Sequence, residues 1–177
     1  KKVWRLKCPT HLIYLEHLDK AFPDARFVMT HRDPTDVMLS VIEVYADIVG
    51  KFTEHLDLHY LAELNITQWS EGMKRAISFR DANDSFGQKN DHRFYDIHFR
   101  AMHEDPIGEV RGLYRWLGEP MTPEFEAGMA RWWKENSENR EPSSRKDASY
   151  YGVDLDRVRG LFTDYVARMD VWTAHTT

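Results

Sequence analysis

The sequence predicts an α/β fold, rich in helix, in which a parallel sheet is flanked by helices. Three observations support this prediction. Strand-like and helix-like patterns alternate over the first 49 residues, as in parallel sheets with right-handed crossovers. An Asp-Pro pair at Asp33 and Pro34 marks a sharp strand-to-helix junction. The 177 residues, 42% of them hydrophobic, suffice for one core, so we expect a single domain over residues 1–177.

The elements follow in order along the chain. Val3 to Lys7 is predicted as a short strand that ends before Pro9, because proline cannot donate to a strand ladder. Apolar residues then recur at helical spacing until a stop near Pro23. Arg26 to Thr30 is predicted as the second strand, and a long helix follows it as far as Val49.

The remaining chain continues this pattern. A helix is predicted over 58–80, a polar loop over 81–92 and a third strand over 93–99. Asp105-Pro106 and Thr122-Pro123 open two further helices, and the polar segment 135–149 is predicted to be an exposed loop. The last helix is predicted from Asp154 to Met169, with its inner face formed by Val158, Leu161, Phe162 and Tyr165.

Charge and cysteine content narrow the class of protein. A formal charge of −5 argues against a protein that coats nucleic acid, which usually presents a basic face. With Cys8 alone there is no internal disulfide, and no apolar run reaches the ~20 residues of a membrane span. We therefore expect a cytoplasmic location. Because the chain opens inside a predicted strand and without Met, we expect it to be part of a longer protein.

Arg32 is the first candidate binding residue. Ligands of open α/β sheets bind beyond the carboxyl ends of strands, close to helix N-termini. Arg32 stands at such an end, and its planar fork matches the oxygens of a phosphate. An alternative is that Arg32 only pairs with Asp33 or Asp36. The position therefore indicates, without proving, a phosphate site.

Ser40 is the second candidate. The long helix is apolar except for one stripe, formed by Asp36, Ser40, Glu43 and Asp47. Ser40 lies about 9 Å along the axis from Pro34, at roughly 1.5 Å per residue. A phosphate held by both Arg32 and Ser40 would lie along the first turns of this helix. The alternative is that Ser40 belongs to a solvated face whose acidic members repel anions.

Lys7 offers a second cation. Strand alternation places it at the end of the first predicted strand, at the same sheet edge as Arg32. A lysine at this position can stabilise the negative charge that develops on a leaving oxygen. The alternative is an ordinary exposed strand end.

Four segments together resemble the sulfotransferase family, in particular its bacterial-type branch. They are "WRLKCPTHLIYLEHL", "FPDARFVMTHRDPTDVMLS", "FYDIHFRAMHEDPIGEVRGLYRWLGEP" and "YYGVDLDRVRGLFTDYVARM". The resemblance implies a P-loop-like fold. It also implies the transfer of a sulfuryl group from 3'-phosphoadenosine 5'-phosphosulfate (PAPS) to a hydroxyl or amine of a small-molecule acceptor. No metal is needed for this reaction. PAPS is then a co-substrate.

The resemblance also implies roles for individual residues. Arg32 and Ser40 match the pair that holds the 3'-phosphate of PAPS, and Lys7 matches a lysine near the transferred group. Tyr95 resembles an aromatic residue close to the adenine, although a buried strand aromatic is the plainer interpretation. Arg145 and Lys146 resemble a late basic element that closes over the 3'-phosphate; otherwise they are ordinary loop residues.

His11 and the missing loop are departures from the family. Cytosolic members carry a catalytic histidine two residues after the lysine, whereas His11 lies four after Lys7, with Pro9 between them. His11 is thus a candidate base. The alternative is that it faces solvent or caps its helix. The glycine-containing loop that wraps the 5'-phosphosulfate is absent from the 177 residues. We therefore expect an incomplete domain, the C-terminal portion of the family fold, without its first strand and loop.

Other classes stay open at this point. A P-loop kinase-like protein would share the strand-helix alternation but would need magnesium and a Walker loop. A non-catalytic binding module would bind no nucleotide. A zinc site at His55 and His59 is disfavoured, because closed sites need four ligands with matched spacing.

Overall fold

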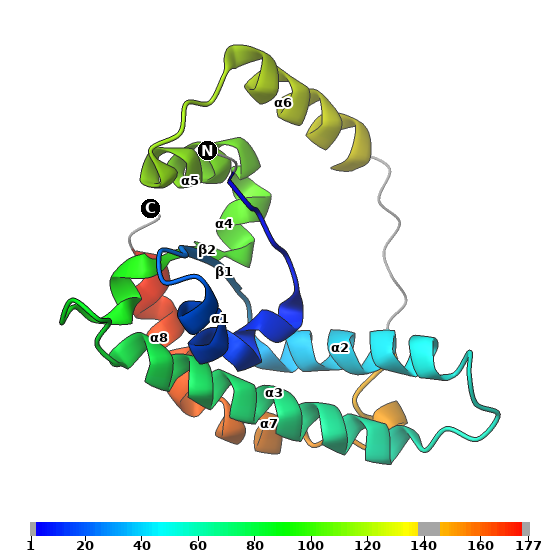
Figure 1. Cartoon of the computed structure of the whole chain (residues 1–177). Helices are drawn as coiled ribbons and strands as arrows, with labels where there is room; N and C mark the ends of the chain where they lie inside the picture. Colours follow the sequence, from blue (N-terminus) through cyan, green and yellow to red (C-terminus); the bar gives the residue numbers. More distant parts are fainter. Residues whose placement is uncertain (1–2, 138–145, 175–177) are drawn as a thin grey trace.

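The computed structural model describes residues 3–137 and 146–174, and it confirms a helix-rich α/β fold. Two strands, β1 (Phe27–His31) and β2 (Phe94–His98), pair in parallel. Their register sets Phe27 opposite Phe94 and His31 opposite His98, so both carboxyl ends lie at one edge. Helices surround this small sheet (Figure 1).

The helices of the first half begin close to the predicted positions. They are η1 (Pro9–Tyr14), α1 (Leu15–Ala21), α2 (Pro34–Val49) and α3 (Leu58–Asp81). Seven further helices belong to the second half of the described chain. They are η2 (Asn90–Arg93), α4 (Phe99–Glu104), α5 (Pro106–Leu117), α6 (Pro123–Ser137), η3 (Ser149–Tyr151), α7 (Leu155–Leu161) and α8 (Thr163–Thr173).

The start of α2 is determined by its cap. The Asp33 carboxylate accepts hydrogen bonds from the backbone N–H groups of Thr35 at 2.8 Å and Asp36 at 3.4 Å. Pro34 occupies the first helical position, where a missing N–H costs nothing. The cap therefore uses N–H groups that a ligand at the helix end would otherwise take.

The main core lies between α2, α3 and the C-terminal helices. Met38 and Ile42 of α2 pack with Ala62 and Ile66 of α3, and all four are almost fully buried. The helices α7 and α8 close this core with Val158, Phe162, Tyr165 and Trp172. Figure 1 shows α2 and α3 side by side; α7 contacts α2, and α8 contacts α3. The junction after β1 thus rests on a well-packed base.

The first predicted strand is wrong. Residues 3–8 are irregular and exposed, with Trp4 81% exposed. A strand needs a neighbour for its N–H and C=O groups, and β1 and β2 pair with each other but not with this segment. Instead, Arg5 forms an ion pair with Glu119, just beyond the end of α5. The β-like alternation of 3–7 therefore has no partner among the described residues.

Two further boundaries differ from the prediction. The last helix is two helices, because the backbone turns at Phe162 between α7 and α8. The short helix α4 directly follows β2, where no helix was predicted. The predicted loop over 135–149 is largely outside the described residues. Its first three residues belong to α6, and its last residue, Ser149, begins η3. Of the predicted inner face of the last helix, Leu161 is only half-buried.

Candidate functional site

The candidate site lies at the carboxyl edge of the sheet. Because His31 pairs with His98, the residues that follow them, Arg32 and Phe99, emerge next to each other. The guanidinium carbon of Arg32 lies 4.5 Å from the centroid of the Phe99 ring. The strand register therefore supplies a flat aromatic support for the cation, an arrangement that attracts it electrostatically.

Asp36 also contacts the guanidinium. Nε and Nη2 of Arg32 donate to Oδ2 of Asp36 at 3.2 and 2.8 Å. Arg32 therefore pairs with Asp36, whereas Asp33 serves as the cap of α2. The Arg32 side chain is still 29% exposed, and within the described part of the chain no acceptor contacts its Nη1. The remaining N–H groups can receive an anion.

Ser40 lies on the same side of α2 as this ion pair. It follows Asp36 by one turn, and side chains at such a spacing are neighbours about 5 to 6 Å apart. Ser40 is half-buried, and its hydroxyl has no hydrogen-bond partner in the ranges 3–137 and 146–174. Through its contact with Asp36, Arg32 therefore lies on the side of α2 that carries Ser40.

A buried polar cluster lies beneath this edge. Asp96 in β2 accepts hydrogen bonds from Arg80 at 2.8 and 2.7 Å and from His31 Nε2 at 2.7 Å. Burial alone would raise the pKa of Asp96, but the hydrogen bonds from Arg80 and His31 outweigh it and lower the pKa. Arg80 also lies over the rings of Phe94 and Trp172. Sequence patterns did not indicate this cluster, since its members are far apart in the chain.

Lys7 and His11, the two predicted catalytic residues, lie before β1 in the chain, in an irregular segment and in η1. Lys7 is in the exposed irregular segment, so the strand that was to bring it beside Arg32 does not form. His11 is half-buried in the turn η1, where its backbone N–H donates to Cys8. The catalytic roles of both residues stay predictions.

Tyr95 does not lie beside Arg32. It stands three residues before the end of β2, about 10 Å back at roughly 3.3 Å per residue, and its ring packs against Trp116 at 5.5 Å. Burial, together with Glu109, raises its pKa. Phe99 is the aromatic residue that contacts Arg32, and the signal that could have found it is its place directly after β2. The role of Tyr95 near the adenine stays a prediction.

The late basic element is only partly described. Lys146 is exposed, with its Nζ 5.4 Å from the ring centroid of Tyr150. Arg145 lies outside the described residues. The proposed contact of either residue with a nucleotide therefore stays a prediction.

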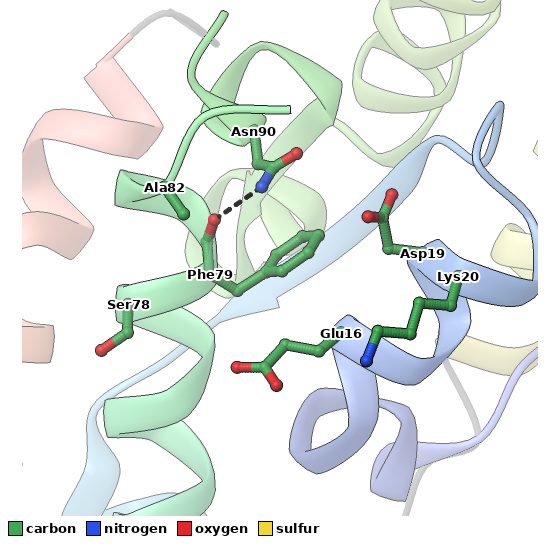
Figure 2. A pocket seen from close by; sticks show the side chains of 7 residues that line it. All are labelled: Glu16, Asp19, Lys20, Ser78, Phe79, Ala82 and Asn90. Carbon is green, nitrogen blue, oxygen red and sulfur yellow. Dashed lines mark hydrogen bonds between the residues drawn. The ribbon is translucent and has the colours of Figure 1, made fainter. Parts of the chain in front are cut away.

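Two hollows elsewhere differ from this site in character. One, of about 330 Å³, lies between α1 and the end of α3, where Phe79 is surrounded by side chains of both charges (Figure 2). Its lining is Glu16, Asp19, Lys20, Ser78, Phe79, Ala82 and Asn90. The other, of about 500 Å³, is an apolar groove between α5 and α6 that includes Trp132 and Trp133. Neither is lined by a residue predicted to bind phosphate.

Residues 3–137 and 146–174 contain no group of three or more histidine, cysteine or acidic side chains arranged to hold a metal ion. Among the helices in these ranges, none combines the length and hydrophobicity that a membrane span requires.

Fold and site together define a class: an α/β protein with a partly exposed arginine at the carboxyl end of a parallel strand, the edge where such folds bind ligands. A sequence model of the sulfotransferase family matches residues 1–123. The chain belongs to the sulfotransferase family.

Similar proteins come from mycobacteria. The chain is 27% identical over 123 residues to the omega-hydroxy-beta-dihydromenaquinone-9 sulfotransferase Stf3 of Mycobacterium bovis and of Mycobacterium tuberculosis. This match covers 67% of the chain but only 29% of each relative. The whole relatives are thus much longer than the shared part.

Solved structures agree in fold. The crystal structure of sulfotransferase STF9 from Mycobacterium avium superposes with a TM-score of 0.76 at 26% identity, covering 94% of this chain and 42% of that protein. Sulfotransferase STF1 from Mycobacterium tuberculosis has a TM-score of 0.69 at 24% identity, over 92% of this chain and 40% of that one, and it supports the fold alone. These neighbours have a P-loop-like fold, which confirms the predicted fold class.

Proposed function

We propose that this chain forms the 3'-phosphate-binding part of an enzyme that transfers a sulfuryl group from PAPS to a hydroxyl or amine. The observation that carries the proposal is the partly exposed guanidinium of Arg32, which lies over the Phe99 ring and on the side of α2 that carries Ser40. Membership of the sulfotransferase family supports the choice of donor.

The residues present suit a phosphate group. Arg32 retains N–H donors on Nη1, and arginine pairs with phosphate oxygens in a bidentate manner. Ser40 offers a hydroxyl that can donate to a third oxygen. The Asp33 carboxylate already accepts hydrogen bonds from the backbone N–H groups of Thr35 and Asp36 at the start of α2. Side chains, rather than the helix end, would therefore hold the anion.

This phosphate does not react, so its role is to position the nucleotide. Binding energy from a remote group can be used to orient the reacting end. In the proposed reaction a base takes the acceptor proton and a cation stabilises charge on the departing phosphate oxygen. His11 and Lys7 are our candidates for these two roles, on the basis of the family resemblance only.

Calorimetric titration of the full-length protein with adenosine 3',5'-bisphosphate tests the proposal. We expect binding without magnesium, and Arg32→Ala should weaken it by about 1.5 to 3 kcal/mol, the range for charged hydrogen bonds. Arg26→Ala is a matched control, since Arg26 is also exposed but donates to the carbonyl groups of Trp116 and Leu117. Unchanged affinity in the Arg32 variant would remove this residue from the site.

The same titration separates the alternatives. A kinase-like protein would require magnesium and would prefer a nucleotide triphosphate. A non-catalytic binding module would show no heat with any of these nucleotides.

A further inference from the structure

We propose that His31 and Tyr165 are positioning residues, which hold the backbone at Arg32 so that its guanidinium faces the phosphate of the nucleotide. This inference rests on the proposed function. It starts from the buried polar cluster, whose hydrogen bonds end at the residue that is to bind the ligand. Neither residue needs to touch the nucleotide.

The base of the arrangement is rigid. Arg80 is 1% exposed, and its guanidinium binds both oxygens of Asp96 while its Nε donates to Asp91 at 2.6 Å. The rings of Phe94 and Trp172 lie 4.2 and 3.7 Å from the guanidinium carbon. A planar bidentate pair of this kind fixes orientation as well as charge. Asp96 is therefore a firmly held acceptor in the centre of the sheet.

His31 is oriented by this acceptor. It is fully buried, with Nε2 2.7 Å from Asp96 and Nδ1 3.3 Å from the hydroxyl oxygen of Tyr165. The imidazole also stacks on the Tyr165 ring, with 5.8 Å between centroids and 22° between planes. His31 is the last residue of β1, so fixing its ring also fixes the direction in which the chain leaves the strand.

Tyr165 makes the final link. Its hydroxyl donates to the backbone carbonyl of Arg32 at 3.4 Å, and Tyr165 belongs to α8, far from Arg32 in the sequence. Burial raises the pKa of Tyr165 to about 12, so the hydroxyl keeps its proton. The carbonyl of Arg32 is thus held from beneath while Phe99 and Asp36 hold its side chain.

A purely structural role and a positioning role predict different measurements. If the cluster only stabilises the core, its loss should affect all nucleotides alike. If the cluster positions Arg32, its loss should weaken the binding of ligands that carry the 3'-phosphate. This effect on affinity should vanish once Arg32 is removed.

The test uses Tyr165→Phe in the full-length protein, which removes one hydroxyl and keeps the ring. We expect the affinity for adenosine 3',5'-bisphosphate to fall about three- to tenfold, the factor for one neutral hydrogen bond, and that for adenosine 5'-phosphate to stay unchanged. In the Arg32→Ala background the same substitution should have no effect. Tyr151→Phe is the matched control, because Tyr151 is equally buried in the same core cluster.

Three results would overturn the inference: equal losses for both nucleotides, no loss, or the same loss without Arg32. Thermal unfolding verifies that each variant is folded; if Tyr165→Phe is not, His31→Gln provides the same comparison. If Arg32→Ala itself leaves binding of the bisphosphate intact, the proposed function fails, and this inference with it. A loss on Arg32→Ala without a loss on Tyr165→Phe contradicts the positioning role alone.

Discussion

The guanidinium of Arg32 lies over the ring of Phe99, although the two residues are far apart in the sequence. Parallel pairing of β1 and β2 causes this contact, since each residue is the first to follow its strand. The site therefore depends on strand register as much as on the presence of an arginine.

Removing the ring should weaken the site without removing the charge. Phe99→Leu should lower the affinity for adenosine 3',5'-bisphosphate by about 0.5 to 1 kcal/mol, the range for an exposed cation–π pair. Titration calorimetry measures this. Phe125→Leu, at a similarly exposed phenylalanine of α6, serves as control, and equal losses in both variants would contradict a specific role of Phe99.

Asp36 should oppose anion binding. Its carboxylate is 2.8 Å from Nη2 of Arg32, so a bound phosphate would meet a like charge close by. In water such a repulsion is about 1 kcal/mol at 4 Å, and Asp36→Asn should tighten bisphosphate binding by about that amount. The measurement is a titration at low salt, where screening is weakest.

Asp47→Asn is the matched control for this change. Asp47 is an exposed member of the same polar stripe, but it lies about three turns further along α2. If both variants tighten binding equally, the effect comes from net charge and not from Asp36. If Asp36→Asn weakens binding, the carboxylate orients Arg32 instead.

The buried ion pair should make folding sensitive to acid. The fold lowers the pKa of Asp96. The stabilisation by its ionised carboxylate is therefore present above the unfolded pKa of about 3.9, and it is lost as the pH falls through the folded pKa. Urea unfolding between neutral and acid pH should show this loss. Asp96→Asn should cost about 3 to 5 kcal/mol at neutral pH, since Arg80 is left buried without its partner.

The control for this prediction is Asp170→Asn, at an exposed position of α8. It should retain both the stability at neutral pH and the loss in acid. An Asp96→Asn variant that unfolds at the same urea concentration as the unaltered protein would show that the pair contributes nothing net.

Packing on the other face of the sheet should depend on Gly112. A Cβ there would lie 2.3 Å from the hydroxyl oxygen of Tyr95, closer than any packed contact allows. Gly112→Ala should therefore destabilise the fold by about 1 to 2 kcal/mol, in the range for overpacking. Thermal unfolding measures the change.

Two variants make this prediction specific. Gly128→Ala in α6, where an added Cβ meets nothing within 4 Å, should be neutral or stabilising by about 1 kcal/mol. Tyr95→Phe combined with Gly112→Ala should restore much of the loss, because the clashing oxygen is gone. Failure of this rescue would mean that Tyr95 is not the obstacle.

The sequence alone was enough to locate the strand-to-helix junction at Arg32. Asp33 and Pro34 act through their own backbone neighbours, so local chemistry determined where α2 starts. The polar stripe with Ser40 also follows from helical spacing, and the motifs around it were sufficient to indicate the family.

Only the tertiary structure decided which residues meet at the junction. The β-like alternation of Val3 to Lys7 was insufficient for a strand, since strands depend on a neighbour that a local pattern does not specify. Phe99 reached Arg32 because of the pairing register, and His31 and Tyr165 met beneath it through the docking of α8. Local interactions are encoded within a few residues, whereas these contacts arise from the packing of distant segments.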